Sequence, residues 1–168
     1  MTDLSVEPLI NKLTEQLSPL FSGPDHPLIV GIETGGYKIA EWLHSELSPD
    51  SQLGKLNISF YRDDFTKIGL HPTVKPSNLP TNIEGKTIIL VDDVLYSGRT
   101  VRAAMNEIFD YGRPDKIILV ILIDRGGREL PIQPDLVGKK LDLKPDQLIK
   151  LEGKSPYTLT ISDSSTND

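Results

Sequence analysis

The chain has 168 residues, of which 38% are hydrophobic and 25% charged, and its formal net charge is −6 at pH 7. This length suits one domain with a sizeable core. The chain contains no cysteine, which excludes disulfides and thiolate nucleophiles and favours a cytoplasmic location. No apolar run is long enough to cross a bilayer and no signal-peptide pattern is visible, so we expect no membrane partner. The acidic balance argues against indiscriminate nucleic-acid binding but allows a local basic face.

The first part of the chain alternates helical and strand patterns. Apolar residues at positions 6, 10, 13, 17 and 20 predict an amphipathic helix, with Asp3 or Ser5 as its cap. The apolar run 28–32 predicts a short buried strand, and a helix follows from about 37 to 47. Apolar and polar residues alternate over 56–61, which predicts a strand with one more polar face.

Residues 62–82 show no period and mix proline, glycine and charges. A loop of this length within a compact domain is usually functional, and we expect a lid. Beyond it, the runs 88–91 and 117–123 predict strands buried on both faces, and the helix between them is expected to end at Gly112.

These elements define an α/β fold class: an open, mostly parallel twisted sheet flanked by helices. We expect a single domain over 1–168, with a core over about 1–123 and a small C-terminal hood over about 124–162. Residues 148–151 and 157–161 are candidate short strands of the hood, and 163–168 form a polar tail that we expect to be disordered.

Residues 88–100, with the sequence IILVDDVLYSGRT, are the most informative segment. A buried strand leads to Asp92 and Asp93, and a small loop with Gly98 then precedes an amphipathic helix. Ligands of such sheets lie at the carboxyl ends of the strands. Amides at a helix N-terminus bind phosphate, and carboxylates accept hydrogen bonds from ribose hydroxyls. The segment therefore predicts a site for a phosphorylated sugar.

The acidic pair has two other interpretations. A solvated strand end is one. The phosphoacceptor cluster of a receiver domain is the other, but it needs the pair after the first strand, and here the pair follows the third candidate strand. The loop directly behind the pair favours the sugar-phosphate site.

The same segment closely resembles the binding motif for phosphoribosyl pyrophosphate (PRPP) of type I phosphoribosyltransferases. The resemblance implies a role for each group of residues. Asp92 and Asp93 would bind the ribose, directly or through hydrated Mg²⁺. The 5′-phosphate would lie on Tyr96, Ser97, Gly98, Arg99 and Thr100. Pyrophosphate would lie on the loop Thr34, Gly35 and Gly36, with Arg62 of the lid closing over it.

Four segments (61–64, 91–104, 112–114 and 124–132) are similar to the family of bifunctional pyrimidine operon regulators and uracil phosphoribosyltransferases, PyrR. This resemblance implies that uracil and PRPP react to give UMP and pyrophosphate with Mg²⁺. It also implies binding to pyrimidine-operon leader RNA and a homo-oligomer, a dimer or higher. The base would be read by Asp124 and the backbone of Leu136, Val137 and Gly138. Two alternatives stay open: a UMP-dependent RNA-binding regulator with little or no activity, and a phosphoribosyltransferase for another base.

The chain departs from its relatives at several of these positions. Gly35 stands where relatives often have arginine, which removes a charge partner for pyrophosphate. Tyr96 stands where purine-specific relatives have a carboxylate, so the proton of uracil passes to pyrophosphate or water if no other base serves. Leu136 replaces an aromatic residue that is common in relatives.

The expected RNA-binding face is weak. Its candidate cations are Arg125, Arg128, Lys139 and Lys140. Phosphate contacts from such cations drive RNA affinity. Relatives that regulate often have histidine near Gly127 and arginine near Gln133, and this chain has neither. We therefore expect enzymatic activity with weaker RNA binding.

Overall fold

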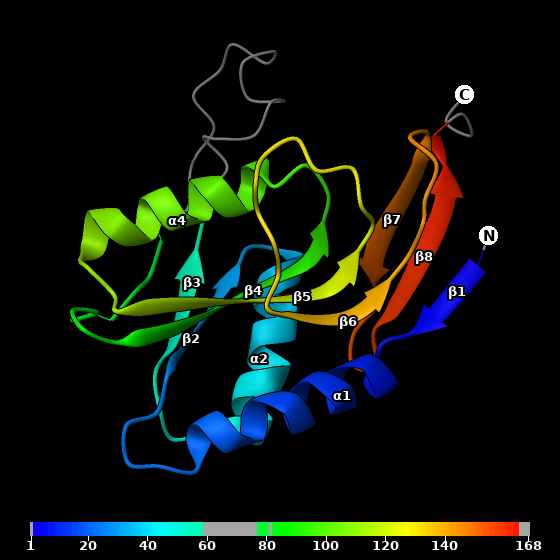
Figure 1. Cartoon of the computed structure of the whole chain (residues 1–168). Coiled ribbons are helices and arrows are strands. Elements are labelled where there is room, and N and C mark those ends of the chain that lie inside the picture. The colour runs from blue at the N-terminus through cyan, green and yellow to red at the C-terminus, as the bar shows by residue number, and fades with distance from the viewer. Residues whose placement is uncertain (1, 59–76, 81, 165–168) are drawn as a thin grey trace.

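The computed structural model describes residues 2–58, 77–80 and 82–164, in two sheets with helices around the larger one (Figure 1). The elements in chain order are β1 (Thr2–Ser5), α1 (Glu7–Leu17), the 3₁₀ helix η1 (Ser18–Phe21), β2 (Leu28–Ile32), α2 (Gly35–Leu47), β3 (Leu53–Leu56), β4 (Thr87–Leu95), α4 (Arg99–Tyr111), β5 (Lys116–Asp124), β6 (Leu136–Lys140), β7 (Gln147–Glu152) and β8 (Thr158–Asp163). The larger sheet has the order β3-β2-β4-β5-β6 and is parallel throughout. The predicted α/β class is confirmed.

Both faces of the large sheet are covered, which explains why its central strands are apolar without alternation. In β4, Ile89 and Val91 belong to a core shared with α1 and α2. Ile88 and Leu90 point the other way, into a second core that α4 covers. The helices in Figure 1 therefore lie in two layers, with α1 and α2 on one side of the sheet and α4 on the other.

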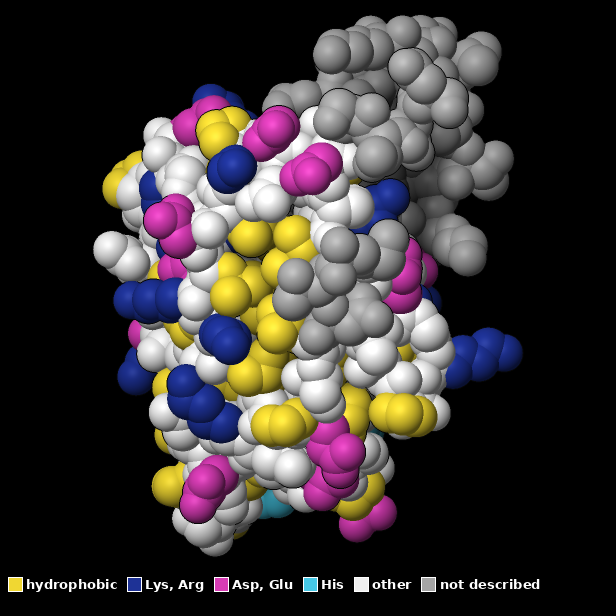
Figure 2. All heavy atoms as spheres, turned by 90° about the vertical axis from the view of Figure 1, so that its right-hand side faces the viewer, with side chains coloured by type: hydrophobic (Ala, Val, Ile, Leu, Met, Phe, Trp, Pro, Cys, Tyr) yellow, Lys and Arg dark blue, Asp and Glu magenta, His cyan; other side chains and the backbone are white. Residues whose placement is uncertain are grey.

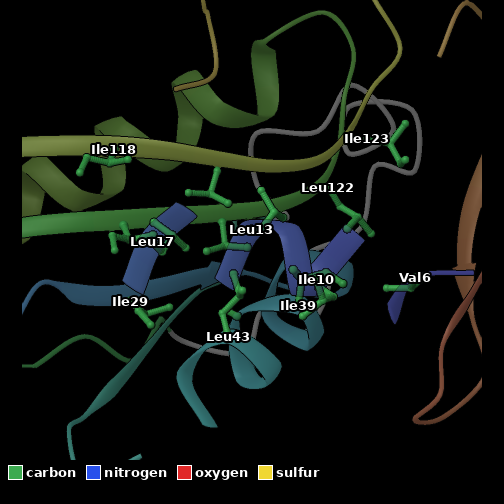
Figure 3. Close-up of a cluster of buried hydrophobic side chains, with 14 of the residues drawn as sticks. Val6, Ile10, Leu13, Leu17, Ile29, Ile39, Leu43, Ile118, Leu122 and Ile123 are labelled. Carbon is green, nitrogen blue, oxygen red and sulfur yellow. The ribbon is translucent and has the colours of Figure 1, made fainter. Parts of the chain in front are cut away.

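The first core is built where α1 crosses α2 and the sheet. Figure 3 shows Ile10, Leu13 and Leu17 of α1 close to Ile39 and Leu43 of α2, and all five are fully buried. The spacing of the three α1 residues by three and four positions places them on one face of the helix, as the sequence predicts.

The predicted cap of this first helix is wrong. The helix begins at Glu7, Val6 is its N-cap, and no side chain caps it. The reason is that Thr2–Ser5 form strand β1, which pairs antiparallel with β8. Val6, which follows this strand, is fully buried and anchors the start of the helix by packing.

Two strand boundaries differ from the sequence predictions. The third strand covers Leu53–Leu56 instead of 56–61, and the backbone N–H of Asn57 donates to the Ser77 hydroxyl instead of to a neighbouring strand. The strand with the acidic pair runs on to Leu95, because its pairing with β5 continues past Asp92. Residues 59–61 lie outside the described residues.

The hood is not a continuous stretch of chain. The predicted hood strands are β7 and β8, but β1 joins them in the order β1-β8-β7. Between Asp124 and the hood, β6 extends the large sheet, and the sequence did not predict it. The side chain of Leu159 in β8 is fully buried in the core that α1 and α2 share, so the hood packs on the main fold. The disorder predicted for 163–168 is wrong for the first two residues, because Asp163 ends β8 and the N–H of Ser164 donates to the Asp146 carbonyl. Residues 165–168 lie outside the described residues.

Candidate active site at the carboxyl edge of the sheet

The acidic pair lies in the middle of the sheet, near the carboxyl ends of its strands. β2 and β5 flank β4, and Asp92 is paired in register with Ile121 of β5. Asp92 is only 6% exposed, and Asp93 is half-buried. An oxygen of Asp92 accepts the N–H of Asp93 at 2.9 Å, and an oxygen of Asp93 accepts the N–H of Val94 at 2.9 Å. These local hydrogen bonds fix the direction of both carboxylates.

The loop before α2 meets this acidic pair. Thr34 is the N-cap of α2, and Gly35 and Gly36 form its first turn. A Cβ atom at Gly36 would lie 2.5 Å from the carbonyl oxygen of Val91, and one at Gly35 would overlap the Asp93 carboxylate. Only residues without a side chain allow the helix N-terminus to approach β4 so closely. The structure thus brings the predicted pyrophosphate loop and the predicted ribose residues together.

A second helix N-terminus follows β4. Gly98 is the N-cap of α4 and has a φ of 90°, a left-handed conformation that favours glycine. The hydroxyl of Ser97 accepts the N–H of Arg99 at 3.2 Å, and the Ser97 carbonyl accepts the N–H groups of Glu129 and Leu130. The loop 97–100 is therefore tied to the segment after β5. The helix begins at Arg99, directly after Gly98.

A cavity of about 390 Å³ lies beside the acidic pair. Its walls are Thr34, Gly35, Lys38, Asp92, Asp93 and residues 149–151 of the hood strand β7. Lys38 and β7 are the parts of this site that the sequence analysis missed. Lys38 could have been found from its place one turn after the loop, whereas nothing local in 149–151 indicates that this strand packs over the cavity.

Tyr96 connects the phosphate loop to the segment after β5. Its ring is 45% exposed, and the Arg125 guanidinium lies over it at 4.2 Å from the ring centroid. Its carbonyl accepts a hydrogen bond of 2.9 Å from Arg128. Arg99, which belongs to the same loop, forms an exposed ion pair of 2.8 Å with Glu129. Two contacts thus connect Tyr96 to the segment after β5, and one contact connects Arg99 to it.

Asp124, predicted to read the base, is paired with Arg128 at 2.6 Å and also accepts the N–H of Gly126 at 3.0 Å. Burial by itself would raise the pKa of Asp124. The hydrogen bonds from Arg128 and Gly126 and the positive charges of Arg128 and Lys140 outweigh that effect, so the pKa lies below its ordinary value. The carboxylate is therefore ionised at neutral pH, and it already forms an ion pair with an arginine.

The predicted basic face needs correction at two of its four residues. Arg125 is only 8% exposed and donates to the carbonyls of Gln147 and Lys144 at 2.9 and 3.0 Å. Arg128 is held by its ion pair with Asp124. Both guanidiniums connect loops of the fold, and the carbonyls that Arg125 binds compensate its burial. Lys139 and Lys140 are exposed at the end of β6.

The backbone predicted to read the base is the beginning of β6. Val137 is paired with Ile121, which is also the partner of Asp92, so Val137 is level with the acidic pair and two strands away from it. Both the Val137 and the Gly138 carbonyls accept a hydrogen bond of 3.1 Å from Lys12 of α1. Leu136, the first residue of the strand, is half-buried.

Other predictions fall outside the described residues or concern absent groups. Arg62 and most of the expected lid, residues 62–76 and 81, are not among the described residues. No group of three or more His, Cys, Asp or Glu residues in the described part of the chain could hold a metal ion. The two carboxylates in the cavity fit an Mg²⁺ ion that phosphate oxygens and waters hold for the most part. Within the described residues, no helix has the length and apolar character to cross a membrane.

Residues 5–149 match the phosphoribosyl transferase domain family. Solved structures with a similar fold include a purine phosphoribosyltransferase from Pyrococcus horikoshii, with a TM-score of 0.63, 23% identity and 82% of each chain covered. A hypoxanthine-guanine phosphoribosyltransferase from Bacillus anthracis has a TM-score of 0.69 and 21% identity over 95% of this chain and 96% of that one. The fold is that of these phosphoribosyltransferases, and the chain belongs to the phosphoribosyl transferase domain family.

Relatives with much higher identity share one name. The bifunctional protein PyrR of Nitrosococcus oceani is 50% identical over 162 residues, which cover 94% of this chain and 92% of that protein. Its namesake from Pseudomonas aeruginosa is 56% identical over 137 residues, which cover 82% of this chain and 81% of that protein. The chain belongs to the PyrR family.

Proposed function

We propose that the protein transfers the phosphoribosyl group of PRPP to uracil and releases UMP and pyrophosphate. The observation that carries this proposal is the meeting of Asp92 and Asp93 with the N-terminus of α2 in one cavity, with the N-terminus of α4 at the end of the same strand. Its relatives are named bifunctional PyrR proteins, which supports uracil as the base.

The reaction demands electrostatic stabilisation. Breaking the anomeric C–O bond leaves positive charge on the ribose and negative charge on the departing pyrophosphate, and preorganised groups lower the barrier most effectively. We assign the ribose hydroxyls to Asp92 and Asp93, the pyrophosphate to the amides of 34–36, and the 5′-phosphate to the loop 96–100. A bound Mg²⁺, held mainly by PRPP, would neutralise part of the phosphate charge near the two carboxylates.

The base is assigned to Asp124 and to the backbone at the beginning of β6. In the sheet, Asp124 is level with Lys140 at the end of β6, whereas Val137 is level with Ile121, three residues before Asp124 in β5. The carbonyls of Val137 and Gly138 already accept hydrogen bonds from Lys12, and Asp124 from Arg128, so uracil would share these acceptors or displace a donor. Tyr96 supplies no carboxylate that could act as a general base. We therefore assign the proton of uracil to pyrophosphate or water.

A panel of bases tests this proposal. Purified protein is incubated with PRPP, Mg²⁺ and uracil, cytosine, hypoxanthine or guanine, and the nucleotide product is quantified. We expect UMP from uracil alone, no product without Mg²⁺, and a strong loss in Asp93→Asn. If another base reacts and uracil does not, the assignment of uracil as substrate is wrong. If the protein binds UMP but no base reacts, the result favours the RNA-binding regulator without enzymatic activity.

A second function, UMP-dependent binding to pyrimidine-operon leader RNA, is supported by one feature of the surface. Lys139 and Lys140 are consecutive exposed residues at the end of β6, and exposed lysines of this kind contact phosphates. Because Arg125 is buried and Arg128 is paired with Asp124, we propose that this RNA binding is weak. Gel shifts with leader RNA, with and without UMP, test it.

The protein is further proposed to form a dimer or higher homo-oligomer in the cytoplasm. Figure 2 shows apolar side chains gathered on the side of the molecule where β1 and β8 lie, with lysine or arginine side chains beside them. An exposed apolar patch of this kind often marks an interface. Sedimentation equilibrium of the purified protein tests the assembly, and cell fractionation tests the location.

A further inference from the structure

The pyrophosphate end of the cavity lacks a cation on its loop. Gly35 has no side chain, and the Asp93 carboxylate fills the space where one would begin. The described residues of this wall therefore place two carboxylates near a leaving group that carries several negative charges. Amides and a metal ion alone would have to offset that repulsion, unless another side chain supplies positive charge.

Lys38 is such a side chain. It lies in the first turn of α2, where its N–H donates to the Thr34 carbonyl at 3.3 Å, and it lines the cavity together with Asp92 and Asp93. It is half-buried, so its position is restricted. A cation one turn behind a phosphate-binding helix N-terminus adds its charge to that of the free amides.

The ammonium group of Lys38 contacts the hood, where Lys38 and Tyr157 line a second cavity together. The Lys38 ammonium lies 5.8 Å from the ring centroid of Tyr157, and the Tyr157 ring is itself 6.3 Å from the Trp42 ring. Contact with an aromatic face attracts an ammonium group and limits its freedom. Tyr157 precedes β8, so a residue distant in sequence contributes to the position of a cation on α2.

Lys150 is the other cation that lines the cavity. Its neighbours Ile149 and Leu151 pack against the core. Side chains alternate between the faces of a strand, so the Lys150 side chain is expected to point away from the core that Ile149 and Leu151 contact. Lys150 is exposed, whereas Lys38 is half-buried, so Lys38 is the more restricted of the two cations.

We propose that Lys38 binds the pyrophosphate group of PRPP and stabilises it as it departs, and that Tyr157 is the residue that positions Lys38. The inference rests on the proposed function, since it takes PRPP as the substrate. It assigns to α2 the positive charge that the loop 34–36 lacks in this chain, and it makes the hood part of the pyrophosphate site.

Calorimetry with inorganic pyrophosphate and Mg²⁺ tests the role of Lys38 without any base or turnover. Lys38→Gln should weaken pyrophosphate binding about tenfold or more, as expected when a charged partner is removed. UMP affinity should stay unchanged, because UMP has no pyrophosphate. Lys38→Arg should retain most of the binding. Lys116→Gln is the matched control, because it removes an exposed lysine at the start of β5, far from the cavity, and should leave both affinities unchanged.

The same titrations test Tyr157. Tyr157→Leu should weaken pyrophosphate binding less than Lys38→Gln does, and Tyr157→Phe should match the wild type because the ring remains. Unchanged pyrophosphate affinity in a folded Lys38→Gln protein, or equal losses for pyrophosphate and UMP, would overturn the proposal. If Lys38→Gln does not fold, equal binding by Tyr157→Leu and wild type would overturn the positioning role. If the wild type makes no UMP, the proposed function is wrong. The pyrophosphate titrations would still test the role of Lys38, because they need no turnover.

Discussion

An oxygen of Asp124 accepts a hydrogen bond of 2.6 Å from the Nη2 atom of Arg128. The same guanidinium donates to the carbonyls of Tyr96 and Ile132, each at 2.9 Å. One arginine thus joins the end of β5 to the phosphate loop after β4. The family resemblance implies that Asp124 reads the base, and Arg128 was a candidate for RNA contact. In the structure they are also partners that hold two parts of the site together.

Asp124→Asn should lower stability at neutral pH by about 2 kcal/mol, as expected for a charged hydrogen bond that loses one partner. Because the folded pKa lies below the ordinary value of 3.8, the ionised carboxylate stabilises the fold above that value and loses the effect as pH falls through the folded pKa. Thermal unfolding between pH 7 and pH 3 should show a gap to the wild type that narrows at the acid end. A gap that stays constant with pH would contradict the ion-pair account, and Asp115→Asn, at an exposed carboxylate, is the control.

Asp93→Asn should reduce Mg²⁺-dependent PRPP binding sharply and leave the fold intact. The loss of a charged hydrogen-bond partner should cost about 1.5–3 kcal/mol of binding free energy. Calorimetry measures the affinity and circular dichroism checks the fold. Unchanged PRPP affinity in a folded Asp93→Asn protein would show that the ribose does not bind at this carboxylate.

Gly35→Ala should weaken PRPP binding more than it weakens the fold. The new Cβ would overlap the Asp93 carboxylate, and this side chain can rotate away more readily than backbone can move. Gly36→Ala is the matched comparison, because its Cβ would meet the backbone of Val91 and Asp92 and should lower the unfolding temperature as well. Full PRPP affinity in Gly35→Ala would mean that Asp93 does not need its present position.

Local patterns predicted the three central strands of the large sheet, β2, β4 and β5, well. Continuous apolar runs such as 117–123 indicate strands buried on both faces, and the spacing of Ile10, Leu13 and Leu17 indicates one helical face. The pairing of β1 with β8 and the extension of β4 past Asp92 depend on contacts between distant segments. No local pattern encodes such contacts, so the cap of α1 and the end of β4 were misplaced.

The same distinction applies to the site. Asp92, Asp93 and the loop 34–36 were predicted together, because the carboxyl ends of parallel strands meet at one edge. The burial of Arg125 was not predictable, since it depends on carbonyls of residues 144 and 147 that reach it only in the folded hood. Arginines after a strand look alike in the sequence whether they contact RNA or bind a neighbouring loop.

RNA binding should depend on the exposed lysines and very little on the buried arginine. Replacing Lys139 and Lys140 together by glutamine should weaken the binding of leader RNA. It should also make the salt dependence shallower: the slope of log affinity against log salt concentration should fall by about 0.7–0.9 for each RNA phosphate that the variant no longer neutralises. Gel shifts at several salt concentrations measure both effects. Replacing Lys86 and Lys116, which lie by the amino ends of β4 and β5, is the control of equal charge. Tight, UMP-strengthened binding that survives the replacement of Lys139 and Lys140 would place the RNA elsewhere on the protein.

The most direct test of the account is a crystal structure of the protein with Mg²⁺, PRPP and a base analogue that does not react. We predict that the ribose hydroxyls lie on Asp92 and Asp93, directly or through hydrated metal, and that the 5′-phosphate lies at the amides of 97–100. The pyrophosphate should lie at the N-terminus of α2. PRPP density in any other cavity, or with its ribose away from the acidic pair, would contradict the account.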